Sequence, residues 1–292
     1  MLKEYAIEPI VIDSYKNARY WLDFFGLDKG RQISRFPKKW KALVMDNVKG
    51  FNEKGYIRER LKNMDSNVFR RGGRSWDNSL SWSENALQEY ERKEFQAIIV
   101  KNNDQKKDNL LVADEVDQTH PKLKLEYQIP IQRDLDGITK WVRPLIEQVN
   151  EIAFVDMYFQ PQKPEYLEPL KRFFKILSEK TNQTNTCQIH FVCGLEKTGE
   201  IKWFKEQCHK FIKPILPLKS RAMIHRIKKE ENHNRYILTE SHCGVLYGHA
   251  IAKASKEQAK DDEITIYNPE INKKRWEKFI TNSGEPDFII EK

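Results

Sequence analysis

The chain has 292 residues and a mass of 34.8 kDa, enough for one large domain or two modest domains with a buried core. It contains no run of about 18 apolar residues, which excludes a membrane-spanning helix, and its first residues lack the apolar stretch of a secretory signal. Four cysteines are too few for a disulfide scaffold, so we expect a reducing, cytoplasmic environment.

The positive charge is concentrated at the start of the chain. Lysine and arginine outnumber aspartate and glutamate by 51 to 43, which gives a net charge of +8. Residues 1–76 hold 17 of these basic residues against 9 acidic ones, and the remainder holds 34 of each. This asymmetry points to a polyanionic partner, nucleic acid (DNA or RNA) first, and a solvated basic surface explains it equally well.

The first part of the chain is predicted to be a basic, mainly helical domain over residues 1–130 that ends in a strand pair. Apolar residues recur at helical spacing in four segments, and a loop rich in Gly, Asn and Ser precedes the fourth. The predicted helices cover 15–26, 35–51, 55–64 and 83–95, the loop 69–82, and the strands 95–100 and 109–116.

Strands and helices alternate in the second part, which predicts an α/β domain over residues 131–292. The predicted helices cover 134–149, 164–180 and 199–215. The predicted strands cover 151–159, 187–194, 220–228, 233–240, 243–248, 263–268 and 287–291.

One short segment in the second part carries residues suited to phosphate chemistry. HNRYILTE reads His233-x-Arg235-x4-Glu240. His233 and Arg235 are two residues apart in a predicted strand and therefore project from the same face. An imidazole can attack phosphorus or protonate a leaving oxygen, and a guanidinium can hold phosphate oxygens bidentately. Glu240 has the opposite parity and joins them only if the strand bends or ends.

This segment, with the alternation before it, resembles half of the phospholipase D superfamily, whose motif is H-x-K-x4-D. The resemblance spans about residues 133–250. It implies an α/β sheet domain and a phosphodiesterase or nuclease that needs no metal or other cofactor. It assigns His233 as nucleophile or general acid, Arg235 as phosphate clamp and Glu240 as positioner of the imidazole. Family enzymes bring together two such histidines, so the resemblance implies a homodimer here. The nearest second motif, His120-x-Lys122, lacks the acid.

Two functions follow as hypotheses. The first is a nucleic-acid phosphodiesterase acting as a homodimer. This hypothesis includes a role in bacterial or antiviral defence, although no particular residue indicates it. The second is a catalytically degenerate module of the same fold that binds nucleic acid or protein within a larger complex. Glycines soon after the motif, at Gly244 and Gly248, are also found in non-catalytic members. A different α/β fold, with His233 an ordinary strand residue, is the third interpretation.

The first part of the chain contains two segments in which basic and aromatic residues alternate, RFPKKWK and FRRGGRSW. Such segments contact phosphates and stack on bases, and the alternative is a basic helix face with a surface loop. For FRRGGRSW we expect an exposed loop whose arginines contribute little to stability. The candidate nucleic-acid-binding residues are Lys38, Lys39, Lys41, Arg70, Arg71, Arg74 and Trp76.

Metal binding receives little support from the sequence. Cys208-His209 and His242-Cys243 are adjacent pairs, whereas zinc ligands are usually two to four residues apart. Asp114, Glu115 and Asp117 are a possible magnesium cluster, but a solvated turn is the favoured interpretation. We therefore expect no metal site.

Overall fold

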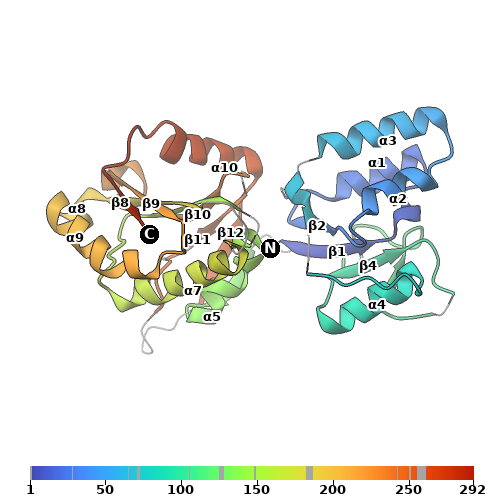
Figure 1. The fold of residues 1–292 in the computed structure, drawn as a ribbon, viewed down its shortest axis with the longest axis horizontal. Coiled ribbons are helices and arrows are strands. Elements are labelled where there is room, and N and C mark those ends of the chain that lie inside the picture. The colour runs from blue at the N-terminus through green and yellow to red at the C-terminus, as the bar shows by residue number, and fades with distance from the viewer. Residues whose placement is uncertain are drawn as a thin grey trace. The chain divides into compact units, whose positions relative to one another are not determined.

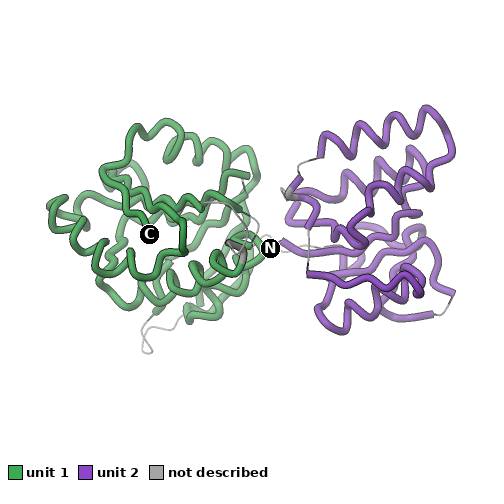
Figure 2. The backbone as a smooth tube through the Cα atoms, in the orientation of Figure 1, with its two compact units in different colours: residues 1, 127–292 green, residues 2–126 purple. Residues whose placement is uncertain are grey.

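A computed structural model gives the fold. It describes residues 2–27, 29–64, 66–70, 73–104, 106–124, 128–147, 149–181, 187–241, 243–249, 251–254 and 261–292. The chain forms two compact units, an N-terminal unit of residues 2–126 and a C-terminal unit of residues 127–292 (Figure 2). The sequence had placed this boundary after residue 130. Both units combine helices with a sheet, and the α/β class predicted for the second part of the chain is confirmed.

The N-terminal unit is built on a sheet of five parallel strands in the order β3-β2-β1-β4-β5. Figure 1 labels β1, β2 and β4 of this sheet. The strands are β1 (Lys3–Ile7), β2 (Arg31–Ser34), β3 (Phe69–Arg70), β4 (Ala97–Val100) and β5 (Leu110–Val112). The prediction of a mainly helical domain therefore needs correction, because β1, β2 and β3 were not expected. The predicted strand pair, β4 and β5, is parallel and does not form a hairpin.

Four helices accompany this sheet, with short 3-10 turns at Pro9–Val11 and Ser66–Val68. Ser14 caps α1 by accepting from the N–H of Asn17, and Ser81 with Glu84 forms a capping box on α4. The helices are α1 (Tyr15–Phe24), α2 (Trp40–Asn47), α3 (Phe51–Asn63) and α4 (Trp82–Arg92).

The C-terminal unit is built on a sheet of eight strands in the order β13-β9-β8-β7-β10-β11-β12-β6. β7, β8 and β9 are parallel to each other, and the other pairs are antiparallel. The strands are β6 (Gln128–Gln132), β7 (Glu151–Asp156), β8 (Gln188–Gly194), β9 (Arg221–Ile227), β10 (Arg235–Thr239), β11 (Gly244–Tyr247), β12 (Asp261–Ile266) and β13 (Phe288–Glu291).

Side chains alternate between the two faces of the sheet along each strand. Apolar side chains pack against both faces. On one face Phe154 of β7 stacks on Phe173 at 5.6 Å and on Phe191 at 5.6 Å between ring centres. On the other face Ala153 and Val155 pack in a cluster with Trp276 and Phe279. The helices are α5 (Leu135–Lys140), α6 (Arg143–Ile146), α7 (Pro164–Thr181), α8 (Leu195–Thr198), α9 (Ile201–Phe211) and α10 (Pro269–Trp276). Shorter turns lie at Lys213–Ile215, Lys229–Glu231 and Glu277–Thr281.

No helix among the described residues has both the length and the apolar character needed to cross a membrane.

Candidate functional site

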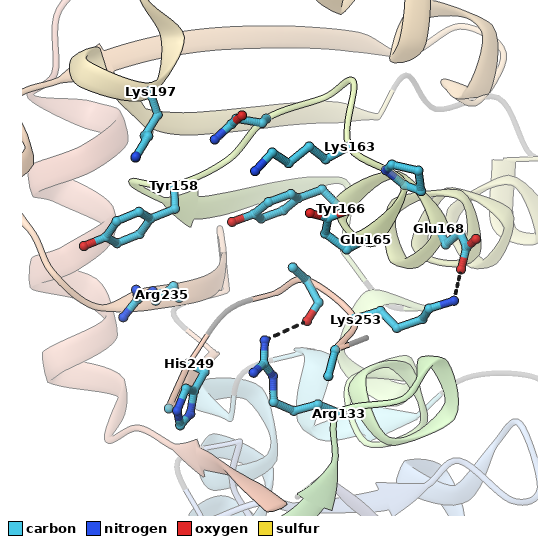
Figure 3. Close-up of a pocket in the computed structure, with 15 residues that line it drawn as sticks. Arg133, Tyr158, Lys163, Glu165, Tyr166, Glu168, Lys197, Arg235, His249 and Lys253 are labelled. Carbon is cyan, nitrogen blue, oxygen red and sulfur yellow. Dashed lines mark hydrogen bonds and ion pairs between the residues drawn. The ribbon is translucent and has the colours of Figure 1, made fainter. Parts of the chain in front are cut away.

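A cavity of about 670 Å³ lies in the C-terminal unit (Figure 3). Its walls come from the chain after β7, the first turn of α7, α8, the start of β10 and the chain after β11. Six basic or imidazole side chains line it, against the two acids Glu165 and Glu168. They are Arg133, Lys163, Lys197, Arg235, His249 and Lys253. The cavity is therefore suited to an anion.

Sheet register explains how Arg235 enters this cavity. β7 and β10 run antiparallel with Tyr236 opposite Val155, so Arg235 lies opposite Asp156 at one edge of the sheet. The Arg235 Cζ lies 4.8 Å from the centre of the Tyr158 ring, and the Lys197 Nζ lies 5.9 Å from it. Figure 3 shows Arg235 beside Tyr158 at one side of the cavity. The tyrosine ring thus gathers two of the cavity's cations on one wall.

Asp156 is a buried carboxyl group at this sheet edge, 3% exposed. Its Oδ1 accepts a hydrogen bond of 2.8 Å from the N–H of Tyr158. Burial raises the pKa of Asp156 to about 6, although the N–H of Tyr158 and the charge of Arg235 act in the opposite direction. Holding this group ionised near neutral pH therefore costs folding free energy.

Asp156→Asn is expected to stabilise the protein at pH 7. The unfolded carboxyl releases its proton near pH 3.8 and the folded one near pH 6, so stability falls as pH rises through that window. A pKa difference of about two between the folded and unfolded states corresponds to a loss of about 3 kcal/mol in folding free energy. Asparagine removes this loss and keeps an oxygen that accepts the hydrogen bond from Tyr158. Urea unfolding at pH 7 and pH 3.5 measures this. The gain should be present at pH 7 and absent at pH 3.5; a gain of equal size at both would contradict the assignment.

His249 is the imidazole that lines the cavity, two residues after β11. Its Nδ1 lies 3.3 Å from the Oδ1 of Asp262, and its backbone N–H donates to Asp262 Oδ2 at 3.2 Å. The Asp262 side chain is 3% exposed and the His249 ring is 66% exposed. A buried carboxylate therefore fixes Nδ1 and leaves Nε2 to act on a ligand, the arrangement used to orient catalytic imidazoles.

Gly248 makes this contact between His249 and Asp262 possible. A Cβ on Gly248 would lie 2.3 Å from Asp262 Oδ1, far inside van der Waals contact. Any other residue at this position would displace the carboxylate that orients His249. The sequence analysis noted Gly248 but assigned no role to His249. The signal that would have found it is a Gly-His pair directly after a strand that neighbours the motif strand.

The three residues of the sequence motif are not brought together. Arg235 lines the cavity. His233 is exposed, lies two residues before β10 and is not among the residues that line the cavity. Glu240 follows the other end of β10, about 17 Å from Arg235 at the usual rise of a strand, and its Oε1 accepts a hydrogen bond of 2.8 Å from the N–H of Asn150. Glu240 is therefore too far away to position His233.

Arg70 and Arg74 of FRRGGRSW form ion pairs within the N-terminal unit, contrary to the expected exposed loop. The Arg74 side chain is 4% exposed and its Nη2 lies 3.0 Å from Glu4 Oε2. It also donates to the carbonyl of Glu89 at 3.0 Å, and its Cζ lies 3.7 Å from the centre of the Phe95 ring. Arg70 Nε lies 3.5 Å from the same Glu4 carboxylate. Arg71 lies outside the described residues.

The other candidate nucleic-acid-binding residues are in the same unit. Lys38 and Lys39 are exposed just before α2. Lys41 donates to the carbonyl of Leu61 at 2.8 Å, and its Nζ lies 3.9 Å from the centre of the Phe69 ring. The Trp76 ring packs edge-on against Phe36 at 5.0 Å. Of these four, only Lys38 and Lys39 combine exposure with an unengaged ammonium in the interactions that the structure gives.

The metal interpretations gain nothing from the structure. Asp114 pairs with Lys101 at 3.1 Å. Within the described ranges, no three His, Cys, Asp or Glu side chains gather as metal ligands. Cys208 is buried, which raises the pKa of its thiol, and His242 lies outside the described residues. Cys187, Cys193 and Cys243 are also buried and free of disulfides.

Comparison with known proteins gives structural likenesses only. No family model and no curated protein matches the chain. A phospholipase D family member, Nuc from Salmonella typhimurium, is similar at 10% identity and a TM-score of 0.38, over 56% of this chain and 98% of that one. TrmBL2, an archaeal chromatin protein with a novel mode of DNA binding, is similar at 9% identity and a TM-score of 0.31. That likeness covers 55% of this chain and 53% of TrmBL2, about half its length.

Proposed function

We propose that the chain is a nucleic-acid phosphodiesterase whose active site is the cavity of the C-terminal unit. The observation that supports this is the His249–Asp262 pair in a cavity where Arg235, Lys163 and Lys197 offer positive charge to a phosphate. Cations neutralise the non-bridging oxygens, and a guanidinium can hold two of them at once.

We infer a second imidazole, His233, from the strand register, although His233 is not among the residues that line the cavity. β10 and β11 run antiparallel with Arg235 opposite Tyr247. The pairing ends at Arg235 and Tyr247; we infer that the two segments run side by side for two more residues, which would bring His233 opposite His249. We infer that the two imidazoles flank one phosphate on the side where Arg235 enters. The sequence analysis expected a homodimer because a second chain would provide the second catalytic histidine. In the proposed active site one chain provides both histidines, His233 and His249.

The proposed chemistry assigns one imidazole as nucleophile and the other as general acid. The nucleophilic nitrogen attacks phosphorus while the other imidazole protonates the leaving oxygen, and water then hydrolyses the phosphohistidine. Asp262 orients the His249 ring through its contact with Nδ1. No metal ion takes part in this scheme.

The second candidate is a binding module that holds nucleic acid without cleaving it. The specific observation in its favour is the 66% exposure of the His249 ring, because catalytic groups work best where water is excluded. In this case Arg235 and the lysines would hold the phosphate and no turnover would occur.

Arg235→Gln tests the phosphate role of the cavity. We expect it to reduce kcat/KM for a labelled oligonucleotide by about 10²-fold or more, because the guanidinium stabilises developing charge on phosphate. Activity should persist in EDTA. The matched control is Arg221→Gln, since Arg221 is half-exposed and pairs with Glu291 away from the cavity. Equal activity of the two variants, or loss of activity in EDTA, would contradict the proposal. Purified wild-type protein that binds the oligonucleotide and never cleaves it would support the binding module.

A further inference from the structure

One face of α1 in the N-terminal unit presents aromatic and basic side chains. Lys16, Arg19, Tyr20 and Asp23 follow the i, i+3, i+4, i+7 spacing of a single helix stripe. The buried residues of the same helix, Ala18, Trp21, Leu22 and Phe24, form its core-facing side. Helical geometry therefore turns the stripe away from the core.

This stripe lines a concave site of about 420 Å³ together with Tyr15 and Gln118. Tyr15 is 45% exposed and Tyr20 is 37% exposed, so both rings offer a face to a ligand. Each of these two rings also packs against a second aromatic ring of the protein. Tyr15 packs on Tyr56 with 4.3 Å between ring centres, and Tyr20 packs edge-on against the buried Trp21 at 5.0 Å. The rings are thus held in place before any ligand arrives.

Two cations, Lys16 and Arg19, and one acid line this site. Two further acids lie beside its tyrosines: Glu53 Oε1 accepts from the N–H of Tyr15 at 3.2 Å, and burial together with the charge of Asp117 raises the pKa of Tyr20. Asp23 is the one acid that lines the site, and its carboxylate forms an ion pair with Arg60. Lys16 and Arg19 are exposed, and within the described part of the chain neither has an acidic partner in the ion pairs given. Two exposed cations without an ion pair among the described residues, beside two packed rings, match the alternation of phosphate and base along a single strand.

We propose that this α1 face, defined as Tyr15, Lys16, Arg19 and Tyr20, binds single-stranded nucleic acid. The tyrosine rings stack on successive bases while Lys16 and Arg19 contact the intervening phosphates. The proposal rests on the proposed nucleic-acid function and adds a binding site in the N-terminal unit, separate from the cavity. A single strand is favoured over a duplex because stacking requires bases whose faces are free.

Fluorescence anisotropy with a labelled 15-nucleotide oligothymidylate tests this with the full chain. We expect Tyr15→Leu combined with Tyr20→Leu to raise Kd by about a hundredfold, about tenfold for each stacked ring. Tyr15→Phe combined with Tyr20→Phe should bind within about threefold of wild type, because phenylalanine still stacks. Leucine variants that bind like wild type, or phenylalanine variants that lose as much as leucine variants, would overturn the proposal.

The charge contribution has its own measurement. Lys16→Gln combined with Arg19→Gln should reduce the slope of log K against log salt by about 1.4, which is about 0.7 for each single-strand phosphate contact. Lys49→Gln combined with Lys62→Gln makes the same charge change at exposed positions of the same unit and should leave the slope unchanged. Equal slopes in both double variants would overturn the proposed site, because they would show that the overall charge of the unit, and not these two positions, sets the salt dependence.

Hydrolysis of bis(4-nitrophenyl) phosphate separates this proposal from the proposed function, since that substrate is too small to need the α1 face. The leucine variant should hydrolyse it like wild type. If wild type fails to hydrolyse it, the enzymatic proposal fails while the anisotropy result still decides the α1 face. A duplex that loses binding as much as the single strand in the leucine variant would overturn the stacking role.

Discussion

Replacing His249 by glutamine is expected to reduce kcat for phosphodiester cleavage by about 10³-fold, since a positioned imidazole contributes about 10² to 10⁴ through proton transfer or attack. Glutamine retains a polar side chain but provides neither a basic nitrogen nor a proton to deliver. The Kd for the oligonucleotide should change little, because the cavity cations and the α1 face remain. Single-turnover cleavage alongside anisotropy separates the two quantities.

Two further histidine variants make this result decisive. His209→Gln is the matched control, since His209 is exposed on α9 and lies outside the cavity lining; its activity should equal that of wild type. His233→Gln should lose as much activity as His249→Gln, because the two imidazoles are proposed to act on one phosphate and groups that act together are not additive. Full cleavage by His249→Gln would contradict the proposed active site. Loss confined to His233→Gln would reassign the catalysis to the motif histidine alone.

Arg74→Ala is expected to destabilise the N-terminal unit by about 3–5 kcal/mol, because removing one partner of a buried ion pair leaves the other charge uncompensated. Glu4 is 8% exposed, and of its two ion-pair partners among the described residues it would keep Arg70, at 3.5 Å. The substitution also removes the hydrogen bond to the Glu89 carbonyl and the contact with the Phe95 ring. Urea unfolding followed by circular dichroism should show an early transition for this unit.

A double variant separates buried charge from lost packing. Glu4→Gln in the Arg74→Ala background should recover part of the lost stability, since it removes the uncompensated carboxylate. Arg58→Ala removes an equal charge at an exposed position of α3 and should change stability by no more than about 0.5 kcal/mol. An Arg74→Ala protein as stable as wild type would restore the exposed loop that the sequence suggested.

Several of the basic residues in the segment 1–76 form contacts inside the protein. Arg70 and Arg74 share Glu4, and Arg60 pairs with Asp23. Arg31 is buried, with its guanidinium over the Phe24 ring at 3.9 Å and its Nη2 donating to the Leu123 carbonyl at 2.8 Å. Several charges counted toward a polyanion partner thus stabilise the fold. The charge count did not distinguish these paired side chains from exposed ones such as Lys16 and Arg19.

The sequence alone determined the α/β class, most strands of the C-terminal unit and the placement of Arg235 in a strand. It did so because alternation and helical spacing record which face of each element is buried. Three strands of the N-terminal unit were missed because they are only two to five residues long, and β1 and β2 are buried with almost no alternation. Such strands carry no periodic signal.

Only the tertiary structure decided the pairs that make the site and the internal contacts. Asp262 reaches His249 from the neighbouring strand β12, Asp156 meets Arg235 across an antiparallel register, and Glu4 meets Arg74 across 70 residues of chain. Local patterns specify each element and its faces. Which two side chains meet is set by strand order and register, which arise when the elements pack together.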